Sequence, residues 1–254
     1  MSNPITPLSA VQERVARLRR LDACAVSDAF DRLKLSGVVS GVPRQSGAGR
    51  IAGVAVTVKL DADSPPAGPP PAQASACSSS VQGSPRGTAR ASHATPPRHL
   101  GTAAIEIAGP DNVIVVEQRT GIEAGCWGGL LTLGAKVRGV AGVVADGPVR
   151  DIDEARMYDF PIFTRALTAT TARGRVVERS TNAPVIAWGM TVNPGDYVIA
   201  DASAVIFIAA VDIDRVLEVA ESIAAREANM AKAILAGVPI SKVMGGDYET
   251  MLRG

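Results

Sequence analysis

The most constraining feature of this sequence is a regular alternation of helical and strand patterns between residues 102 and 163. Helix-like spacing and β-branched runs take turns there, separated by short glycine-containing links. The expected elements are a helix at Thr102–Ile107, a strand at Asn112–Glu117, a helix at Gly129–Val137, a strand at Gly139–Ala145, a helix at Ile152–Tyr158 and a strand at Pro161–Phe163. This order predicts an α/β fold in which part of the sheet is parallel.

The residues before this alternation predict two short helices and a strand. Apolar residues recur at helical spacing between residues 7 and 33, and Asp22 is placed to cap the second helix. The segment Arg50–Leu60, "RIAGVAVTVKL", alternates and is rich in β-branched residues, so we expect a strand.

The segment Asp61–Pro97 breaks the pattern. It is crowded with Pro, Ser, Ala and Gly, and Val81 is its only large aliphatic residue. Such a composition buries too little apolar area to offset the entropy cost of ordering, so we expect a disordered, solvated loop inserted into the domain. A natural insertion, a local frameshift and a functional linker are all compatible with it. His93 and His99, in or beside this segment, are poor metal ligands because the metal itself would have to order them.

The C-terminal third predicts a different kind of structure. Short β-rich runs follow residue 173, and the turn signal "NPGD" stands at Asn193–Asp196. These runs indicate a small barrel-like or swivelling β layer. An amphipathic pattern predicts a long helix over Val211–Leu235. We expect one domain spanning residues 1–254.

Composition narrows the classes of partner. The chain has 254 residues, 46% of them hydrophobic, which is enough for a sizeable core, and its formal net charge is +1. A charge this small argues against nucleic acid or an anionic membrane as partners and favours a small molecule or a protein. The 3 cysteines have neither disulfide nor zinc-site spacing. Neither a signal peptide nor an apolar run long enough for a membrane span is evident, so we expect a cytoplasmic protein.

The strongest candidates for catalytic residues are the adjacent Arg150 and Asp151. The apolar strand "VAGVVAD" and a glycine–proline turn deliver this pair at the strand's C-terminal end, where α/β sheets form ligand crevices. An alternative interpretation is that Asp151 and Glu154 are simply a capping box for the next helix. The two interpretations are compatible, because a capping carboxylate can present its outer oxygen to a cation.

A second candidate feature is the glycine pair Gly128–Gly129 at the start of a predicted helix. Glycines allow close approach to a ligand, and free N–H groups of a first helical turn bind anions such as carboxylates. Ordinary close packing of helix against strand explains a lone glycine pair equally well. The neighbouring Cys126 and Trp127 are expected to be packing residues.

Taken together, the segments "GGLL", "AGVVADGPVRD" and "NPGDYVIAD" resemble the RraA-like family, which includes class II 4-hydroxy-4-methyl-2-oxoglutarate aldolases and regulators of ribonuclease E. The resemblance covers most of the chain outside residues 61–97. It implies an α/β/α sandwich of the swivelling β/β/α type. It also implies a homotrimer, or a dimer of trimers, with active sites between subunits.

The resemblance further implies roles for individual residues. Arg150 would contact a 2-oxo acid substrate, and Asp151 would serve a divalent metal, Mg²⁺ or Mn²⁺. The backbone that would hold the pyruvate carboxylate belongs to Gly128, Gly129, Leu130 and Leu131.

One departure from the family pattern bears on the chemistry. Aldolase members resemble the pattern aspartate, twenty residues, Arg-Asp, whereas this chain has Gly129 at the first position. Regulator-type members resemble glycine, twenty residues, Arg-Asp, two residues, Glu-Asp; this chain has Glu154 but Ala155 in place of the last acid. Two weak candidates could replace the absent carboxylate: Glu123, and Glu227 reaching a neighbouring subunit's site from the long C-terminal helix.

The sequence therefore leaves two main hypotheses open, and a weaker third, a catalytically crippled chain whose long loop disturbs assembly. The first is a metal-dependent lyase that generates pyruvate enolate, by retro-aldol cleavage of 4-hydroxy-2-oxo acids or by decarboxylation of oxaloacetate. Decarboxylation is expected to survive better, because retro-aldol cleavage needs a general base. The second is a non-catalytic trimer that binds and masks a ribonuclease or another protein.

Overall fold

The computed structural model describes residues 8–63 and 99–245. The expected disordered insertion at Asp61–Pro97 lies almost entirely outside these residues, as does His93. Its first three residues are described, and the first two of them continue strand β3, which ends at Ala62 rather than at Leu60.

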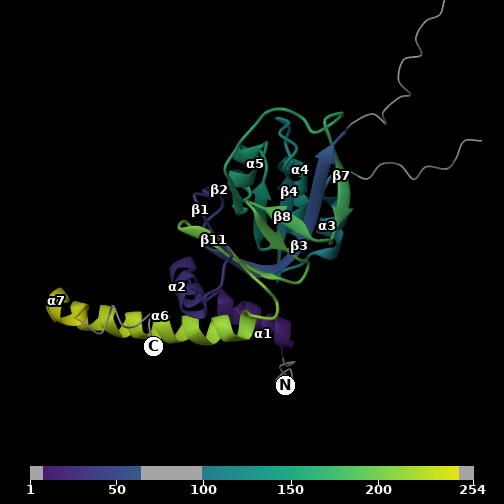
Figure 1. Cartoon of the computed structure of the whole chain (residues 1–254). Helices are drawn as coiled ribbons and strands as arrows, with labels where there is room; N and C mark the ends of the chain where they lie inside the picture. The colour runs from purple at the N-terminus through teal and green to yellow at the C-terminus, as the bar shows by residue number, and fades with distance from the viewer. Residues whose placement is uncertain (1–7, 64–98, 246–254) are drawn as a thin grey trace, which may run out of the picture.

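Four parallel strands form the centre of a nine-stranded mixed sheet (Figure 1). They are β3 (Ile51–Ala62), β4 (Asn112–Gln118), β5 (Gly142–Asp146) and β6 (Ile162–Thr164), and neighbours pair in that order. Almost every residue of β4 and β5 is buried, as expected for strands covered on both faces.

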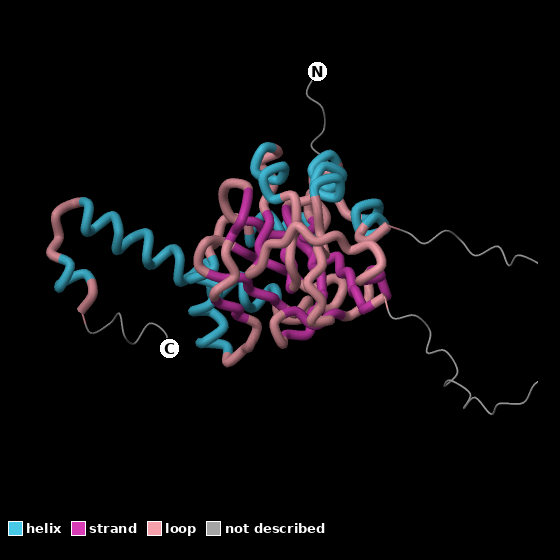
Figure 2. Tube along the Cα trace, turned by 90° about the horizontal axis from the view of Figure 1, so that it is seen from above, coloured by secondary structure: helices cyan, strands magenta, loops and turns pink. Residues whose placement is uncertain are grey.

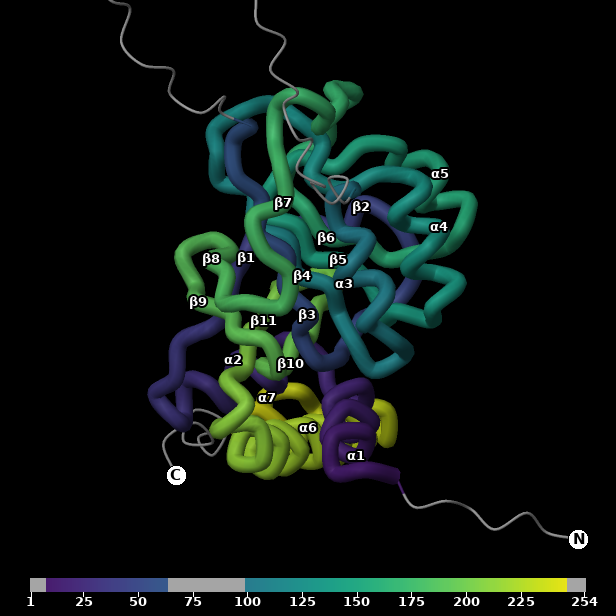
Figure 3. The backbone as a smooth tube through the Cα atoms, turned by 90° about the vertical axis from the view of Figure 1, so that its right-hand side faces the viewer, coloured from purple at the N-terminus to yellow at the C-terminus, as the bar shows by residue number. Residues whose placement is uncertain are grey.

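Different elements pack against the two faces of these four parallel strands (Figure 3). Ile114 and Val116 of β4 pack in one cluster with helices α3 (Thr102–Ile107), α4 (Gly129–Val137) and α5 (Ile152–Met157). Val113 and Val115, on the opposite face of β4, pack in another cluster with the hairpin β8 (Val185–Ala187) and β9 (Met190–Val192). Because successive side chains of β4 point to opposite faces of the sheet, this one strand packs against both layers.

Antiparallel strands extend the sheet on both sides. The full order is β1-β11-β10-β3-β4-β5-β6-β2, and β7 also pairs with β3. The bounds of these strands are β1 Val38–Ser40, β2 Arg44–Ser46, β7 Val176–Thr181, β10 Tyr197–Ala200 and β11 Ala204–Ile208. The β-rich C-terminal third thus supplies both the separate hairpin and part of the main sheet.

Three helices pack against the antiparallel end of the sheet: α1 (Ala10–Leu18), α2 (Ala23–Leu33) and α6 (Ile213–Leu235), as Figures 1 and 3 show. The Asp22 carboxylate caps α2 by accepting from the Ala25 N–H over 2.8 Å, as predicted. The second half of α6 and the short α7 (Ile240–Val243) project from the body (Figure 2).

The mixed sheet and its helical layer confirm the predicted α/β fold class. Within the residues that the structure describes, no helix is both long and apolar enough to cross a membrane.

Candidate active site

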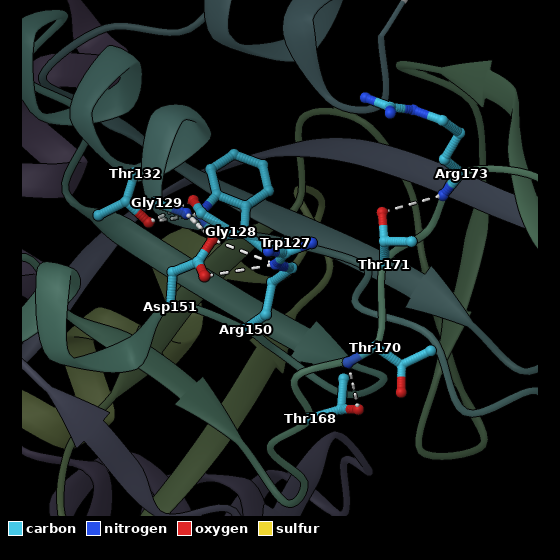
Figure 4. A network of polar contacts seen from close by, with 10 residues as sticks. All are labelled: Trp127, Gly128, Gly129, Thr132, Arg150, Asp151, Thr168, Thr170, Thr171 and Arg173. Carbon is cyan, nitrogen blue, oxygen red and sulfur yellow. Dashed lines mark hydrogen bonds and ion pairs between the residues drawn. The ribbon is translucent and has the colours of Figure 1, made fainter.

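Three backbone segments continue side by side beyond the parallel strands and bring Arg150 to the start of α4 (Figure 4). Val149 forms isolated parallel bridges with Trp127 on one side and Leu167 on the other. The Arg150 N–H donates to the Trp127 carbonyl over 3.0 Å. The Arg-Asp pair and the glycine pair, about twenty residues apart in the sequence, therefore meet at one corner of the fold.

Asp151 connects the two ends of this stretch directly. Its Oδ2 accepts a hydrogen bond from the Gly129 N–H over 3.0 Å, and Arg150 Nε lies 3.2 Å from the same oxygen. Figure 4 shows the carboxylate between the guanidinium and the beginning of α4. The carboxylate thus lies between a side-chain cation and a helix N-terminus.

The interpretation of Asp151 as a capping residue is wrong. Asp151 occupies the N-cap position of α5, but its side chain makes no capping hydrogen bond. Its backbone is left-handed, with φ 56° and ψ 38°, a conformation that is uncommon outside glycine. The carboxylate of Asp151 turns toward α4 instead, and strained residues of this kind cluster at functional sites.

Glycines make room for the charged side chains at this corner. A Cβ at Gly125 would lie 3.0 Å from the Arg150 side chain, and a Cβ at Gly128 would lie 3.0 Å from Asp151 Oδ2. At Gly129 the space of a Cβ is filled by the Glu154 carboxylate. The glycines therefore allow three charged side chains to converge on the start of α4.

Glu154 also belongs to this site. The sequence predicted it only as part of a capping box or of a family motif. It lies in the first turn of α5, three residues after Asp151, and its carboxylate fills the space that a side chain at position 129 would take. The two other candidates for the absent acid are differently placed. Glu123 accepts from the Thr168 hydroxyl over 3.1 Å on the loop beside Arg150. For Glu227, burial and the nearby Asp28 on α2 raise the pKa, and α2 belongs to a different layer.

The first turn of α4 has the form of an anion site. Its N-cap, Gly128, offers no side chain to the helix, and the Gly129 N–H is bonded to Asp151. Leu130 is 85% exposed, so the helix start is open to solvent, whereas Leu131 is buried. The Thr132 hydroxyl donates to the Gly128 carbonyl and fixes the turn.

Cys126 and Trp127 are packing residues, as predicted. Both are buried, and Trp127 Nε1 donates to Thr132 Oγ1 over 3.0 Å. Burial raises the pKa of the Cys126 thiol to about 12, so this cysteine is not a nucleophile at neutral pH.

The donor set at this corner fits a loosely held hard cation. Asp151 and Glu154 supply two carboxylates, and no cluster of three His, Cys, Asp or Glu side chains with metal-site geometry exists in residues 8–63 and 99–245. Mg²⁺ is commonly held by one or two carboxylates, with water and substrate oxygens completing the shell. His99 lies in the described part of the chain; it is exposed and lines a pocket together with Leu130 and Leu131 of α4.

Comparisons with known proteins show which proteins this chain resembles. The chain is 31% identical over 147 residues to an uncharacterized protein of Methanocaldococcus jannaschii, a match that covers 57% of this chain and 70% of that protein. It is 31% identical over 127 residues to a Halalkalibacterium halodurans protein named "Putative 4-hydroxy-4-methyl-2-oxoglutarate aldolase", covering 50% of this chain and 60% of that protein.

Among solved structures, RraAS2 of Streptomyces coelicolor, described as an unusual member of the RNase ES inhibitor RraA protein family, has the same fold. The TM-score is 0.64 at 21% identity, and the match covers 88% of this chain and 97% of that chain. The model of the RraA-like family (Aldolase/RraA) matches residues 23–207, which include every residue of the corner described above. The chain therefore belongs to the RraA-like family.

Proposed function

We propose that this protein is a divalent-metal-dependent lyase that releases pyruvate from a small 2-oxo acid. Its substrates are 4-hydroxy-2-oxo acids of the 4-hydroxy-4-methyl-2-oxoglutarate type, oxaloacetate, or both. The observation that carries the proposal is the convergence of Arg150, Asp151 and the first turn of α4, with a 3.0 Å hydrogen bond from Gly129 to Asp151 at its centre. A relative named as an aldolase supports the same chemistry.

Each part of the corner has a distinct role in this proposal. The N–H groups of Gly129, Leu130 and Leu131 bind the substrate carboxylate, because a helix N-terminus attracts anions. Arg150 contacts the keto oxygen and stabilises the negative charge that develops there. Asp151 would hold Mg²⁺ or Mn²⁺, with Glu154 beside it, and the bound cation would polarise the keto group.

Both reactions leave the same product ion. Cleavage of the C3–C4 bond leaves its electron pair on C3 as pyruvate enolate, and the other fragment departs as CO₂ or as a carbonyl compound. Retro-aldol cleavage also requires removal of the C4 hydroxyl proton by a general base. Position 129 carries no carboxylate, so Glu154 is our candidate for the proton acceptor. Decarboxylation needs no such step, and we expect it to be the faster reaction.

A coupled assay tests the proposal. Purified protein with Mg²⁺ or Mn²⁺ is expected to release pyruvate from oxaloacetate above the rate of the metal alone, and from 4-hydroxy-4-methyl-2-oxoglutarate more slowly. Chelator should stop both reactions. If pyruvate release never exceeds that of the free metal, the lyase proposal fails, and the masking of a ribonuclease becomes the function to test.

The bond between Asp151 and Gly129 predicts an order of binding. Asp151 occupies an N–H group that the substrate carboxylate needs, so it must turn away before a 2-oxo acid can bind fully. A cation bound to Asp151 would favour that turn. We therefore expect calorimetry to show pyruvate binding at least about tenfold more tightly with Mn²⁺ than with chelator, since one charge-assisted hydrogen bond is at stake. Equal affinity under both conditions would contradict this order.

We also propose that the chain assembles as a homotrimer, or as a dimer of trimers. In support, α4 exposes an apolar stripe beside the active corner: Leu130 and Val137 are 85% and 78% exposed, and Leu133 lies between them on the same face. Apolar side chains gathered on one exposed helix face are typical of protein interfaces. A subunit contact on this stripe would lie next to the substrate.

A further inference from the structure

A second cavity lies at the carboxyl ends of the parallel strands, separate from the corner around Arg150. Its volume is about 340 Å³, and it is lined by the last residues of three neighbouring strands, Gln118 of β4, Asp146 of β5 and Thr164 of β6. None of its lining residues belongs to the corner formed by Arg150, Asp151 and Glu154. The carboxyl ends of parallel strands are where α/β sheets bind ligands.

Two arginines give one side of this cavity a positive charge. Arg119 and Arg165 line it, and neither forms an ion pair with a carboxylate of the described residues. Arg165 is held in place: its guanidinium donates to the carbonyls of Ser40 and Gly41 over 2.8 and 3.1 Å. It also lies 5.4 Å from the centre of the Trp188 ring. A fixed guanidinium without a carboxylate partner is suited to binding an anion.

Two other lining residues, Asp146 and Gln118, supply hydrogen-bond acceptors. Asp146 contributes a carboxylate whose Oδ2 accepts from the Trp188 N–H over 2.7 Å. The Gln118 side chain is buried, and its Nε2 donates to the Ile122 carbonyl over 3.1 Å, which directs Oε1 toward Gly147. Oε1 accepts no hydrogen bond from any described residue. A buried acceptor without a donor is unusual and costs free energy.

The turn between β8 and β9, which contains Trp188, supports a binding role for the cavity. Trp188 and Gly189 join β8 to β9 as a two-residue turn in which both residues have positive φ, 47° and 86°. Such turns strongly favour Asn-Gly or Asp-Gly. A tryptophan at the first position is strained, and this residue lines the cavity.

We propose that this cavity binds a small α-amino acid, with acidic amino acids preferred. A ligand with negative charge only would be repelled by the Asp146 carboxylate, and a ligand with positive charge only would be repelled by the two arginines. A ligand that presents carboxylates to Arg119 and Arg165 and an ammonium group to Asp146 matches both sides. Two arginines and one aspartate leave a net charge of +1, which an acidic amino acid balances. The ammonium group has three donors, enough for Asp146, and Gln118 Oε1 could accept one of them once its buried side chain turns toward the cavity.

Calorimetry with L-aspartate and L-glutamate tests the proposal, with succinate and L-malate as matched comparators. Succinate keeps both carboxylates but has no amino group, and L-malate has a hydroxyl in its place. We expect saturable binding of an acidic amino acid, with succinate at least about tenfold weaker because a charge-assisted bond is lost. Absence of binding, or succinate binding equally well, would overturn the proposal.

Variants locate the site. Asp146→Asn keeps an acceptor for the Trp188 N–H and so preserves the hairpin, but we expect it to weaken aspartate binding at least about tenfold. Arg119→Ala should also weaken it. Arg226→Ala, an exposed arginine on α6, is the control. Arg150→Ala should leave amino-acid binding unchanged, which separates this cavity from the proposed active site. Unchanged affinity in Asp146→Asn, or loss of binding in Arg150→Ala, would place the ligand elsewhere.

Discussion

Replacing Asp151 by asparagine is expected to lower metal-dependent pyruvate release by about 100-fold or more. Asparagine has the same size, and its carbonyl oxygen can still accept from the Gly129 N–H, so the backbone arrangement should survive. The variant loses the charge that would hold the cation, and metal activation is worth several kcal/mol, with each 1.36 kcal/mol a factor of ten in rate. The measurement is kcat/KM for oxaloacetate at saturating Mg²⁺.

A nearby aspartate provides the control for this variant. Asp153→Asn changes an exposed carboxylate two residues away, which pairs with Arg156 over 2.8 Å. We expect it to retain nearly full activity. Mn²⁺ binding, followed by electron paramagnetic resonance without substrate, should weaken in Asp151→Asn and not in Asp153→Asn. If Asp151→Asn keeps both its activity and its Mn²⁺ affinity, Asp151 is not the metal ligand.

The second large effect is expected from a single methyl group. In Gly129→Ala the new Cβ would occupy the space of the Glu154 carboxylate, and it would lie 3.3 Å from Asp151 Cβ. Glu154 must then move away. We expect kcat/KM for 4-hydroxy-4-methyl-2-oxoglutarate to fall by about tenfold to 100-fold, because small displacements of catalytic groups have effects of this size and Glu154 is our candidate for the general base of retro-aldol cleavage. Alanine favours helix over glycine, so the loss should occur without loss of folding.

A double-mutant cycle shows whether this loss acts through Glu154. In a Glu154→Ala background no carboxylate remains to be displaced, so adding Gly129→Ala should cost little further activity. Gly134→Ala is the matched control in the same helix, since its Cβ would meet Ile105 only at ordinary contact distances of 3.6 and 3.7 Å. If Gly129→Ala lowers activity equally with and without Glu154, the effect arises from the backbone of α4 instead.

The elements with strong local signals were predictable from sequence. Helices α3 and α4 begin and end at the predicted residues. Strand β5, however, begins at Gly142 rather than Gly139, because Gly139 has φ 74° and terminates α4. Strands β1 and β2 have three residues each, too few to show an alternating pattern. Their position at the sheet edges depends on long-range pairing.

The candidate site was predictable in its members but not in their orientation. Strand order places Arg150 and Asp151 at the carboxyl end of β5, which the sequence pattern already indicated. The direction of the Asp151 side chain depends on its left-handed backbone, and the capping rule assumes an extended one. The position of Glu154 depends on how α5 packs against α4. Residue spacing alone could not give either result.

The two bridges of Val149 have a consequence for how the corner responds to ligands. Val149, the residue before Arg150, pairs with Trp127 on one side and with Leu167 on the other, so the parallel pairing of the sheet continues up to this point. The Arg150 N–H also donates to the Trp127 carbonyl. The main chain of the corner is therefore held by sheet-like pairing, and in the proposed function substrate binding would require rotamer changes of Asp151 and Glu154. Less ordering entropy opposes binding in such a site, so more of the contact energy remains available as affinity.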